Sequence, residues 1–301
     1  MHCSGLWPPA ATPLAADFGI DRRALLTHCQ AMLAEGADGL AILGTTSEAN
    51  SLSLGERIAL IEALIEGGVE ARRLLPGTGA CAVPDAVEMS RQAMRAGCAG
   101  TLLLPPFFYK NVPDAGLFDY VSQVVDGVGD NRLRIYLYHI PQMAGAGWSL
   151  DLIGRLRDAF PEVVVGLKDS SGDWNNTRAI IEAFPGFAVF PASESILSEA
   201  IPLGAAGCIS ATANVNAGGI AALIAALRAG REALTAQADA TAIREAVSAF
   251  PLVPAVKAVL AARYGNAGWC RVRAPLRPLD DAEARRLLAA PALADLLDRA
   301  A

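Results

Sequence analysis

Short apolar runs and longer stretches of helical period alternate along most of the chain. Each short run leads into a turn that contains Gly, Pro, Thr or Ser, and then into apolar residues at helical spacing. The short runs predict eight strands, at residues 5–13, 39–43, 73–77, 100–105, 133–139, 163–168, 187–190 and 207–210. The longer stretches predict helices at residues 21–35, 55–66, 85–96, 113–128, 150–160, 173–184 and 215–228. This alternation predicts parallel strands joined by right-handed crossovers.

Several predicted strands are apolar on both faces, as in LLLPP at residues 102–106 and VVVGL at residues 163–167. Such strands need cover on both sides. Because the chain has eight strand–helix units in all, we predict a closed α/β barrel of the (β/α)8 (TIM) type. After residue 230 the strand signal stops, and Ala-, Leu- and Arg-rich helical patterns continue, interrupted by prolines 251, 254, 275 and 278. We therefore predict a catalytic barrel domain at residues 1–230 and a C-terminal helical extension at residues 231–301, which either braces the barrel or builds a subunit interface.

Composition narrows the possible partners and the compartment. With 301 residues, 53% hydrophobic and 19% charged, the chain can bury a large core in one domain. Its net charge of -6 and scattered basic residues argue against nucleic acid. Six cysteines without a C-x-x-C pair indicate reduced thiols and a cytoplasmic setting. The N-terminus lacks an export pattern and no run reaches about 18 apolar residues, so we expect no membrane span.

Lys168 is the first candidate for chemistry. The chain has only three lysines (Lys110, Lys168 and Lys257) among 25 basic residues, and Lys168 ends the apolar run VVVGLK. In a parallel barrel that position lies at the catalytic mouth. Burial there disfavours the ammonium form, and a neutral amine can attack a ketone carbonyl, which arginine cannot do. The alternative is a lysine that extends to solvent or pairs with Asp169.

Two other strand ends carry suitable polar groups. Tyr138 ends the run IYLYHIP, so its phenol can carry a proton at the same mouth, unless it is only a packing aromatic beside Tyr136. The segment from Gly44 through Thr45 and Thr46 to Glu48 offers hydroxyls and backbone N–H groups that could cradle a small carboxylate, with Gly44 permitting close approach. The alternative role for this segment is plain capping by its Thr and Ser residues.

Together these places resemble the dihydrodipicolinate synthase and N-acetylneuraminate lyase family, which comprises class I, Schiff-base-forming, pyruvate-dependent lyases and aldolases. The resemblance runs from Leu6-Trp7-Pro8 through Ala211-Thr212-Ala213-Asn214, so it covers essentially the whole barrel. Its markers are Leu43-Gly44-Thr45-Thr46-Ser47-Glu48, Gly77-Thr78-Gly79, Leu104-Pro105-Pro106-Phe107-Phe108-Tyr109, Tyr138-His139-Ile140-Pro141, Gly166-Leu167-Lys168-Asp169-Ser170-Ser171-Gly172 and Gly207-Cys208-Ile209-Ser210.

The resemblance implies roles for these residues. Lys168 would form the Schiff base and Tyr138 would shuttle protons. Thr46 would hold the carboxylate of the pyruvyl group, and Ile209 would line the pyruvate pocket. Thr45 and Tyr109 match the family's proton relay, in which the tyrosine reaches across from a neighbouring subunit, so the resemblance also implies a homodimer or homotetramer. The loop that holds Tyr109, PPFFYKNVPDAG, differs in length and residues from the usual family pattern.

The acceptor substrate is where the sequence departs from the synthases. Their segment after the catalytic tyrosine usually carries an arginine for the second carboxylate, and the matching residue here is Met143. A thioether cannot make a bidentate carboxylate contact. The resemblance therefore favours reversible aldol cleavage of a 2-oxo-3-deoxy sugar acid or a 4-hydroxy-2-oxo acid into pyruvate and an aldehyde. A 4-hydroxy-tetrahydrodipicolinate synthase and a related dehydratase are the alternatives. His139 and Ser47 also differ from residues common in the family and would reshape the acceptor pocket.

Other function classes have less support. Gly77-Thr78-Gly79 follows a strand like a phosphate loop, but no acidic residue near position 97–100 could bind a ribose hydroxyl. A G-x-S-x-G elbow for serine hydrolysis is absent, so Ser170, Ser171 and Asp173 are better explained as loop and cap groups. Neither a metal nor another cofactor is predicted, because there is no H-E-x-x-H motif. A nonenzymatic protein that binds a 2-oxo acid remains the outside alternative.

Overall fold

The barrel wall is built from short parallel strands. The computed structural model describes residues 2–298. Its strands are β1 (Gly5–Leu6), β2 (Thr101–Leu103), β3 (Ile135–His139), β4 (Val164–Asp169), β5 (Ala188–Pro191) and β6 (Gly207–Cys208). β2, β3, β4 and β5 form one sheet in that order, and β1 pairs with β6. Isolated parallel bridges join Leu40 to Leu74 and Gly77 to Leu102.

Backbone hydrogen bonds close these pieces into one ring. Beyond the pairs within the two sheets, residues 38–41 bond to residues 6–8, residues 40–42 to residues 73–77, residues 74–78 to residues 99–102, and residues 206–209 to residues 189–191. Eight chain segments therefore form the wall, and the two segments around Leu40 and Leu74 belong to it through isolated bridges and backbone hydrogen bonds, without forming longer strands. The predicted (β/α)8 barrel is confirmed.

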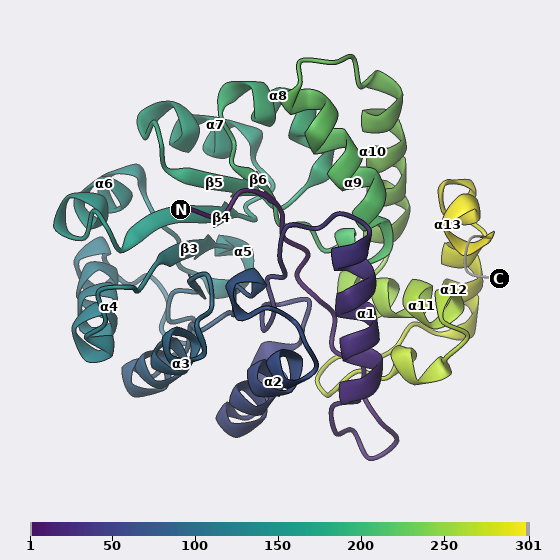
Figure 1. Cartoon of the computed structure of the whole chain (residues 1–301), viewed down its shortest axis with the longest axis horizontal. Coiled ribbons are helices and arrows are strands. Elements are labelled where there is room, and N and C mark those ends of the chain that lie inside the picture. The colour runs from purple at the N-terminus through teal and green to yellow at the C-terminus, as the bar shows by residue number, and fades with distance from the viewer. Residues whose placement is uncertain (1, 299–301) are drawn as a thin grey trace.

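Helices cover the outside of this wall and continue past it (Figure 1). They are α1 (Arg22–Ala34), α2 (Leu54–Glu66), α3 (Val83–Ala96), α4 (Asp114–Val128), α5 (Pro141–Ala144), α6 (Leu150–Ala159), α7 (Trp174–Ala183), α8 (Leu197–Leu203), α9 (Ala213–Arg228), α10 (Leu234–Ser248), α11 (Leu252–Arg263), α12 (Asp281–Leu288) and α13 (Ala294–Asp298). Figure 1 shows α11 to α13, in yellow-green and yellow, gathered at one side of the barrel. A C-terminal helical part is thus present, while the boundary at residue 230 stays a prediction.

Alternation along the strands produces two cores. In β3, Ile135 and Leu137 pack in the layer between strands and helices, whereas Tyr136 and Tyr138 pack in a second cluster inside the barrel. Because successive side chains of a strand point to opposite faces, a strand covered on both faces is apolar at nearly every position. This explains runs such as LLLPP and VVVGL.

Three details of the prediction were wrong, each because of proline. The first strand ends at Leu6 instead of residue 13, since Pro8, Pro9 and Pro13 have no N–H for a ladder. Helix α8 was not predicted, because it is short and contains Pro202. Pro254 does not interrupt a helix, because it lies in the first turn of α11, where its missing N–H costs nothing.

The C-terminal helices pack against the barrel through their own apolar core. Val256, Val259 and Leu260 of α11 belong to a cluster that also contains Ala11 and Val215 of the barrel. Within residues 2–298 no single helix is long and apolar enough to cross a membrane. Only α10 and α11 taken together reach that length and apolar character, and the two helices are bent by 110° relative to each other.

His28 of α1 is a buried polar link in this contact. Its Nε2 lies 2.9 Å from Asn214 Oδ1, and its Nδ1 lies 2.9 Å from the hydroxyl of Tyr264. Since Asn214 Oδ1 also accepts from Ala11 N, His28 Nε2 carries the proton and Nδ1 accepts one. Burial lowers the pKa of His28 from 6.5 to about 4, so the ring is neutral at pH 7.

Acidification should weaken the fold through His28. Between pH 6.5 and 4 the unfolded chain binds a proton that the folded chain excludes, so stability falls as the pH falls. Between pH 7 and pH 5 this group should account for about 2 kcal/mol of the free energy of unfolding. Urea unfolding of His28→Gln at the two pH values should show a pH dependence smaller by that amount. His2→Gln, at an exposed position, is the control; equal pH dependence in both variants contradicts the assignment.

Candidate active site

The register of β3 on β4 places Tyr138 beside Lys168. The two residues are paired across the strands, and both side chains are 4% exposed. Lys168 Nζ lies 4.3 Å from the centre of the Tyr138 ring, over its face. Because both residues end parallel strands, they meet at the carboxyl-end mouth of the barrel, where the catalytic groups of this fold lie. The sequence prediction that these two side chains share one mouth is confirmed.

Lys168 has no partner within residues 2–298: its amine forms neither an ion pair nor a hydrogen bond there. The neighbouring Asp169 is occupied elsewhere, because it accepts from Ser171 N (2.9 Å), Asn176 Nδ2 (2.9 Å) and Thr177 Oγ1 (2.6 Å). The alternatives of a solvent-exposed lysine and of an Asp169 pair are therefore wrong. Within residues 2–298 the closest aromatic neighbour of the Lys168 amine is therefore the Tyr138 ring, and no carboxylate pairs with it.

The segment after residue 43 contributes hydroxyl groups to the same place. Thr45 Oγ1 lies 3.1 Å from the hydroxyl of Tyr138, so the phenol is oriented by a group that can donate or accept. Thr46 is buried, and its hydroxyl forms no hydrogen bond within residues 2–298. A Cβ on Gly44 would meet no atom within 4 Å, so the space beside its backbone is open. These groups can meet a small carboxylate.

The floor of the site is apolar. Ile209 is fully buried in the same interior cluster as Tyr138 and Phe190. Cys208 precedes it, and burial raises the pKa of this thiol well above 9, with Glu194 adding to the rise and Arg244 and Lys168 opposing it. Cys208 is therefore a protonated packing thiol and not a competing nucleophile.

Two predicted residues stand apart from this cluster. Met143 lies on α5, just after β3, and its side chain is 62% exposed. Tyr109 is 72% exposed and packs edge-on against Phe108, with ring centres 5.3 Å apart. Within residues 2–298 the hydroxyl of Tyr109 forms no hydrogen bond. One chain therefore brings Lys168, Tyr138 and Thr45 together and leaves Tyr109 outside.

His139 and Ser47, which the sequence analysis connected with the shape of the acceptor pocket, both have buried structural contacts, and that connection stays a prediction. His139 follows Tyr138 and so faces the other side of the strand, where its Nδ1 accepts from Trp148 N at 3.0 Å. Burial lowers its pKa, with Asp169 opposing the shift. Ser47 Oγ donates to Ala10 O at 2.5 Å. Both side chains support the wall of the site.

The sequence analysis missed a buried polar cluster after β5 and β6. The Glu194 carboxylate, fully buried, accepts from the hydroxyls of Ser210 and Thr212. Arg244 of α10 donates to Ser210 Oγ at 3.0 Å and lies 3.7 Å from Glu194. Gln237, also on α10, donates to Glu194 O at 2.8 Å. A lone Glu in the loop PASESIL carries no sequence signal for such a cluster, because its partners come from two other segments, residues 210–212 and α10.

The glycines of Gly77-Thr78-Gly79 have a packing role. A Cβ on Gly77 would lie 2.1 Å from Leu43 O, and one on Gly79 would lie 2.5 Å from Leu104 N. Only glycine lets these neighbouring segments approach so closely. This accounts for the motif without a phosphate loop. Likewise, Asp173 caps α7 by accepting from Asn175 N at 2.9 Å, as the sequence predicted.

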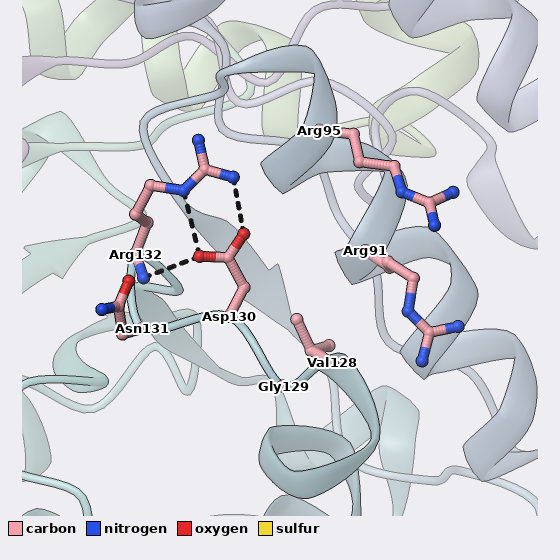
Figure 2. A pocket seen from close by; sticks show the side chains of 7 residues that line it. All are labelled: Arg91, Arg95, Val128, Gly129, Asp130, Asn131 and Arg132. Atoms are coloured by element: carbon pink, nitrogen blue, oxygen red, sulfur yellow. Dashed lines mark hydrogen bonds and ion pairs between the residues drawn. The ribbon is translucent and has the colours of Figure 1, made fainter.

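A separate pocket lies away from Lys168. Figure 2 shows a pocket of about 550 Å³ lined by Arg91, Arg95, Val128, Gly129, Asp130, Asn131 and Arg132. The loop between α4 and β3 forms part of it, so it lies at the amino ends of the strands, opposite Lys168. Its Arg132 is already bonded to Asp130, as the dashed lines show. No group of three or more His, Cys, Asp or Glu side chains suited to a metal occurs in the described part of the chain.

Comparisons agree with this geometry. The sequence model described as the dihydrodipicolinate synthetase family matches residues 2–291. An uncharacterized DapA-like lyase of Chloroflexus aurantiacus is 32% identical over 287 residues, which cover 95% of each chain. The crystal structure of dihydrodipicolinate synthase from Agrobacterium tumefaciens is 32% identical with a TM-score of 0.88, covering 97% of this chain and 99% of that one. YagE from E. coli, a prophage protein of the dihydrodipicolinic acid synthase family crystallised with pyruvate, is 27% identical with a TM-score of 0.88, covering 97% and 98%.

Removal of the Lys168 amine should leave the fold intact. Lys168→Met replaces a buried group that has no partner within residues 2–298, so the free energy of unfolding should stay the same or rise by about 1 kcal/mol. The control is Lys257→Met, which leaves its buried partner Glu48 unpaired and should cost about 3 to 5 kcal/mol. Urea unfolding measures both. Equal losses in the two variants would show that Lys168 has a stabilising partner.

Proposed function

The chain belongs to the dihydrodipicolinate synthetase family and is thus a pyruvate-dependent lyase, and we propose that it cleaves a 2-oxo-3-deoxy sugar acid or a 4-hydroxy-2-oxo acid reversibly, through a Schiff base on Lys168. The observation that carries this proposal is the buried Lys168 amine over the ring of Tyr138, whose hydroxyl meets Thr45. The Lys168 amine thus lies beside the Tyr138 phenol, and the phenol lies beside the Thr45 hydroxyl. A proton can pass along these groups during the reaction.

The first half of the reaction forms the iminium. The Lys168 amine attacks the C2 carbonyl of the 2-oxo acid, and the carbinolamine loses water to give a positively charged imine. Thr46 and the open backbone beside Gly44 hold the carboxylate next to that carbon, while Ile209 packs against its apolar side. Tyr138 gives and takes the protons of the carbinolamine hydroxyl, and Thr45 relays them.

The second half breaks the carbon–carbon bond. The C4 hydroxyl loses its proton to the tyrosine relay, the C3–C4 bond breaks, and its electron pair moves to the iminium to give an enamine. The aldehyde leaves, C3 takes up a proton, and water hydrolyses the imine to release pyruvate and the free amine. The iminium is the electron sink, so the protein's own groups supply the acid–base steps.

Met143 favours an aldolase over a synthase. It lies on α5, which follows β3 closely in the chain, at the position that the family resemblance assigns to the second carboxylate, and its thioether offers no charge. Lys110 Nζ is bonded to Ala144 O at 3.2 Å, so the nearest lysine is engaged with backbone. Condensation of pyruvate with aspartate semialdehyde, a dehydratase reaction and nonenzymatic binding of a 2-oxo acid are the alternatives that the experiment must separate.

Borohydride reduction and a substrate panel test the proposal. With pyruvate and borohydride, wild type should gain mass on Lys168, whereas Lys168→Met should gain none; absence of the adduct in wild type would overturn the Schiff base. Pyruvate release should then be measured from 2-oxo-3-deoxy sugar acids and 4-hydroxy-2-oxoglutarate, beside condensation with aspartate semialdehyde. Condensation alone would replace the aldolase by a synthase. Loss of water without carbon–carbon cleavage means a dehydratase, and trapping without any turnover means a binding protein.

We further propose that the active unit is a homodimer or homotetramer in which Tyr109 serves the site of a neighbouring subunit. The exposure of Tyr109 and Phe108 at the catalytic mouth supports this, because two adjacent large aromatics are more often covered than left in water. The six free thiols support a reducing, cytoplasmic compartment.

Tyr109→Phe should slow turnover by about tenfold or more, because a relay group is lost. The amount of pyruvate adduct on Lys168 should stay unchanged. Phe108→Leu is the control, since it changes an equally exposed neighbour without a hydroxyl. Unchanged turnover in Tyr109→Phe removes Tyr109 from the relay, and sedimentation as a monomer under assay conditions excludes the neighbouring-subunit role.

A further inference from the structure

The turn that carries Thr45 and Thr46 is bounded by two residues in an unfavourable backbone conformation. Leu43 has a φ of 58° and Glu48 a φ of 57°, and neither is glycine. A non-glycine residue in this left-handed region costs about 1 kcal/mol or more, so it persists only where the surroundings fix it. Something outside the turn must therefore hold residues 43–48 in place.

Glu48 is held by two residues of the C-terminal part of the chain. One carboxylate oxygen accepts from Lys257 Nζ of α11 at 2.5 Å, and the other accepts from Arg273 N at 2.8 Å. The side chains of Lys257 and Glu48 are 0% and 2% exposed, so this ion pair lies fully inside the protein. Burial lowers the pKa of Lys257, and Glu48 opposes that shift, so the lysine depends on its partner to stay charged.

Lys257 also reaches the segment that lies against the turn. Its Nζ donates to Thr12 O at 2.9 Å. Thr12 Oγ1 in turn donates to Ser47 O at 2.9 Å, and Ser47 Oγ donates to Ala10 O at 2.5 Å. All of these groups are buried. One ammonium group therefore contacts the turn from two sides, directly through Glu48 and indirectly through the segment around Thr12 that follows β1.

We propose that Glu48 and Lys257 are a positioning pair, by which α11 holds Thr45 and Thr46 in the geometry that receives the substrate carboxylate and orients Tyr138. This rests on the proposed function for the roles of the two threonines. A buried ion pair adds little net stability compared with apolar packing, whereas its fixed geometry selects one arrangement of the chain. The pair thus fits a positioning role better than a purely stabilising one.

The test uses a double variant, Glu48→Gln with Lys257→Met, which removes both charges and leaves neither unpaired. The matched control is Glu35→Gln with Arg263→Met, because that pair also joins α11 to the barrel but lies on α11 and the end of α1, away from the turn. For both, the concentration of pyruvate that gives half-maximal borohydride trapping on Lys168 is measured, together with amide exchange of residues 43–49 without ligand.

We expect the Glu48/Lys257 double variant to fold and to form the adduct at saturating pyruvate, with the half-saturating concentration raised about tenfold. Amide exchange in residues 43–49 should become faster, and the control should match wild type in both measurements. Half-saturation and exchange equal to those of the control would overturn the positioning role. If the folded Glu48/Lys257 double variant formed no adduct on Lys168 at any pyruvate concentration, the positioning role would be overturned too. The defect would then lie at Lys168 itself.

Failure of the proposed function has a separate signature. If wild type itself gains no mass on Lys168, the Schiff base is wrong whatever the variants do. The amide exchange measurement needs no substrate, so it still decides whether the buried pair fixes the turn. If the double variant does not fold, Glu48→Gln alone, which keeps the size of the side chain and one of its two acceptor oxygens, is carried through the same two measurements.

Discussion

The in-register pairing of β3 and β4 is the constraint on which the site depends. Tyr138 and Lys168 are opposite each other only because these parallel strands are paired at that register, and a slip by one residue would turn one of the side chains to the helix layer. The register is fixed by burial on both faces: Leu137 and Leu167 fill the outer layer while Tyr136 and Tyr138 fill the interior. Hydrophobic packing therefore determines where the amine and the phenol meet.

Polar contacts from the C-terminal part of the chain then hold the loops at the mouth. Lys257 binds the turn after residue 43, and Arg244 binds the cluster of Glu194 and Ser210 after β5 and β6. The backbone N–H of Arg273 completes the contacts of Glu48. Loops cannot be fixed by apolar packing alone, because their backbone polar groups need partners. The extension thus braces the barrel at its catalytic face, one of the two roles that its sequence left open.

The sequence predicted those features that repeat with a regular period or stand at a strand end. Eight apolar runs indicated the barrel, and a rare lysine after VVVGL indicated the amine. It could not predict features made by distant segments. Helix α8 was hidden by Pro202, and the contact of His139 Nδ1 with Trp148 N comes from a separate segment. The Glu194 cluster joins three segments that share no local pattern.

The two buried lysines show why burial alone does not define a reactive amine. Lys168 and Lys257 are 4% and 0% exposed, and each follows an apolar run in the sequence. Lys257 Nζ donates to the Glu48 carboxylate at 2.5 Å and to Thr12 O at 2.9 Å. These two acceptors favour its ammonium form, so Lys257 has a structural role. Lys168 faces an aromatic ring instead, and Asp169, the nearest acid in sequence, is turned toward α7. The presence or absence of a buried partner distinguishes the two lysines, and that partner is a property of the fold because it comes from a distant segment of the chain.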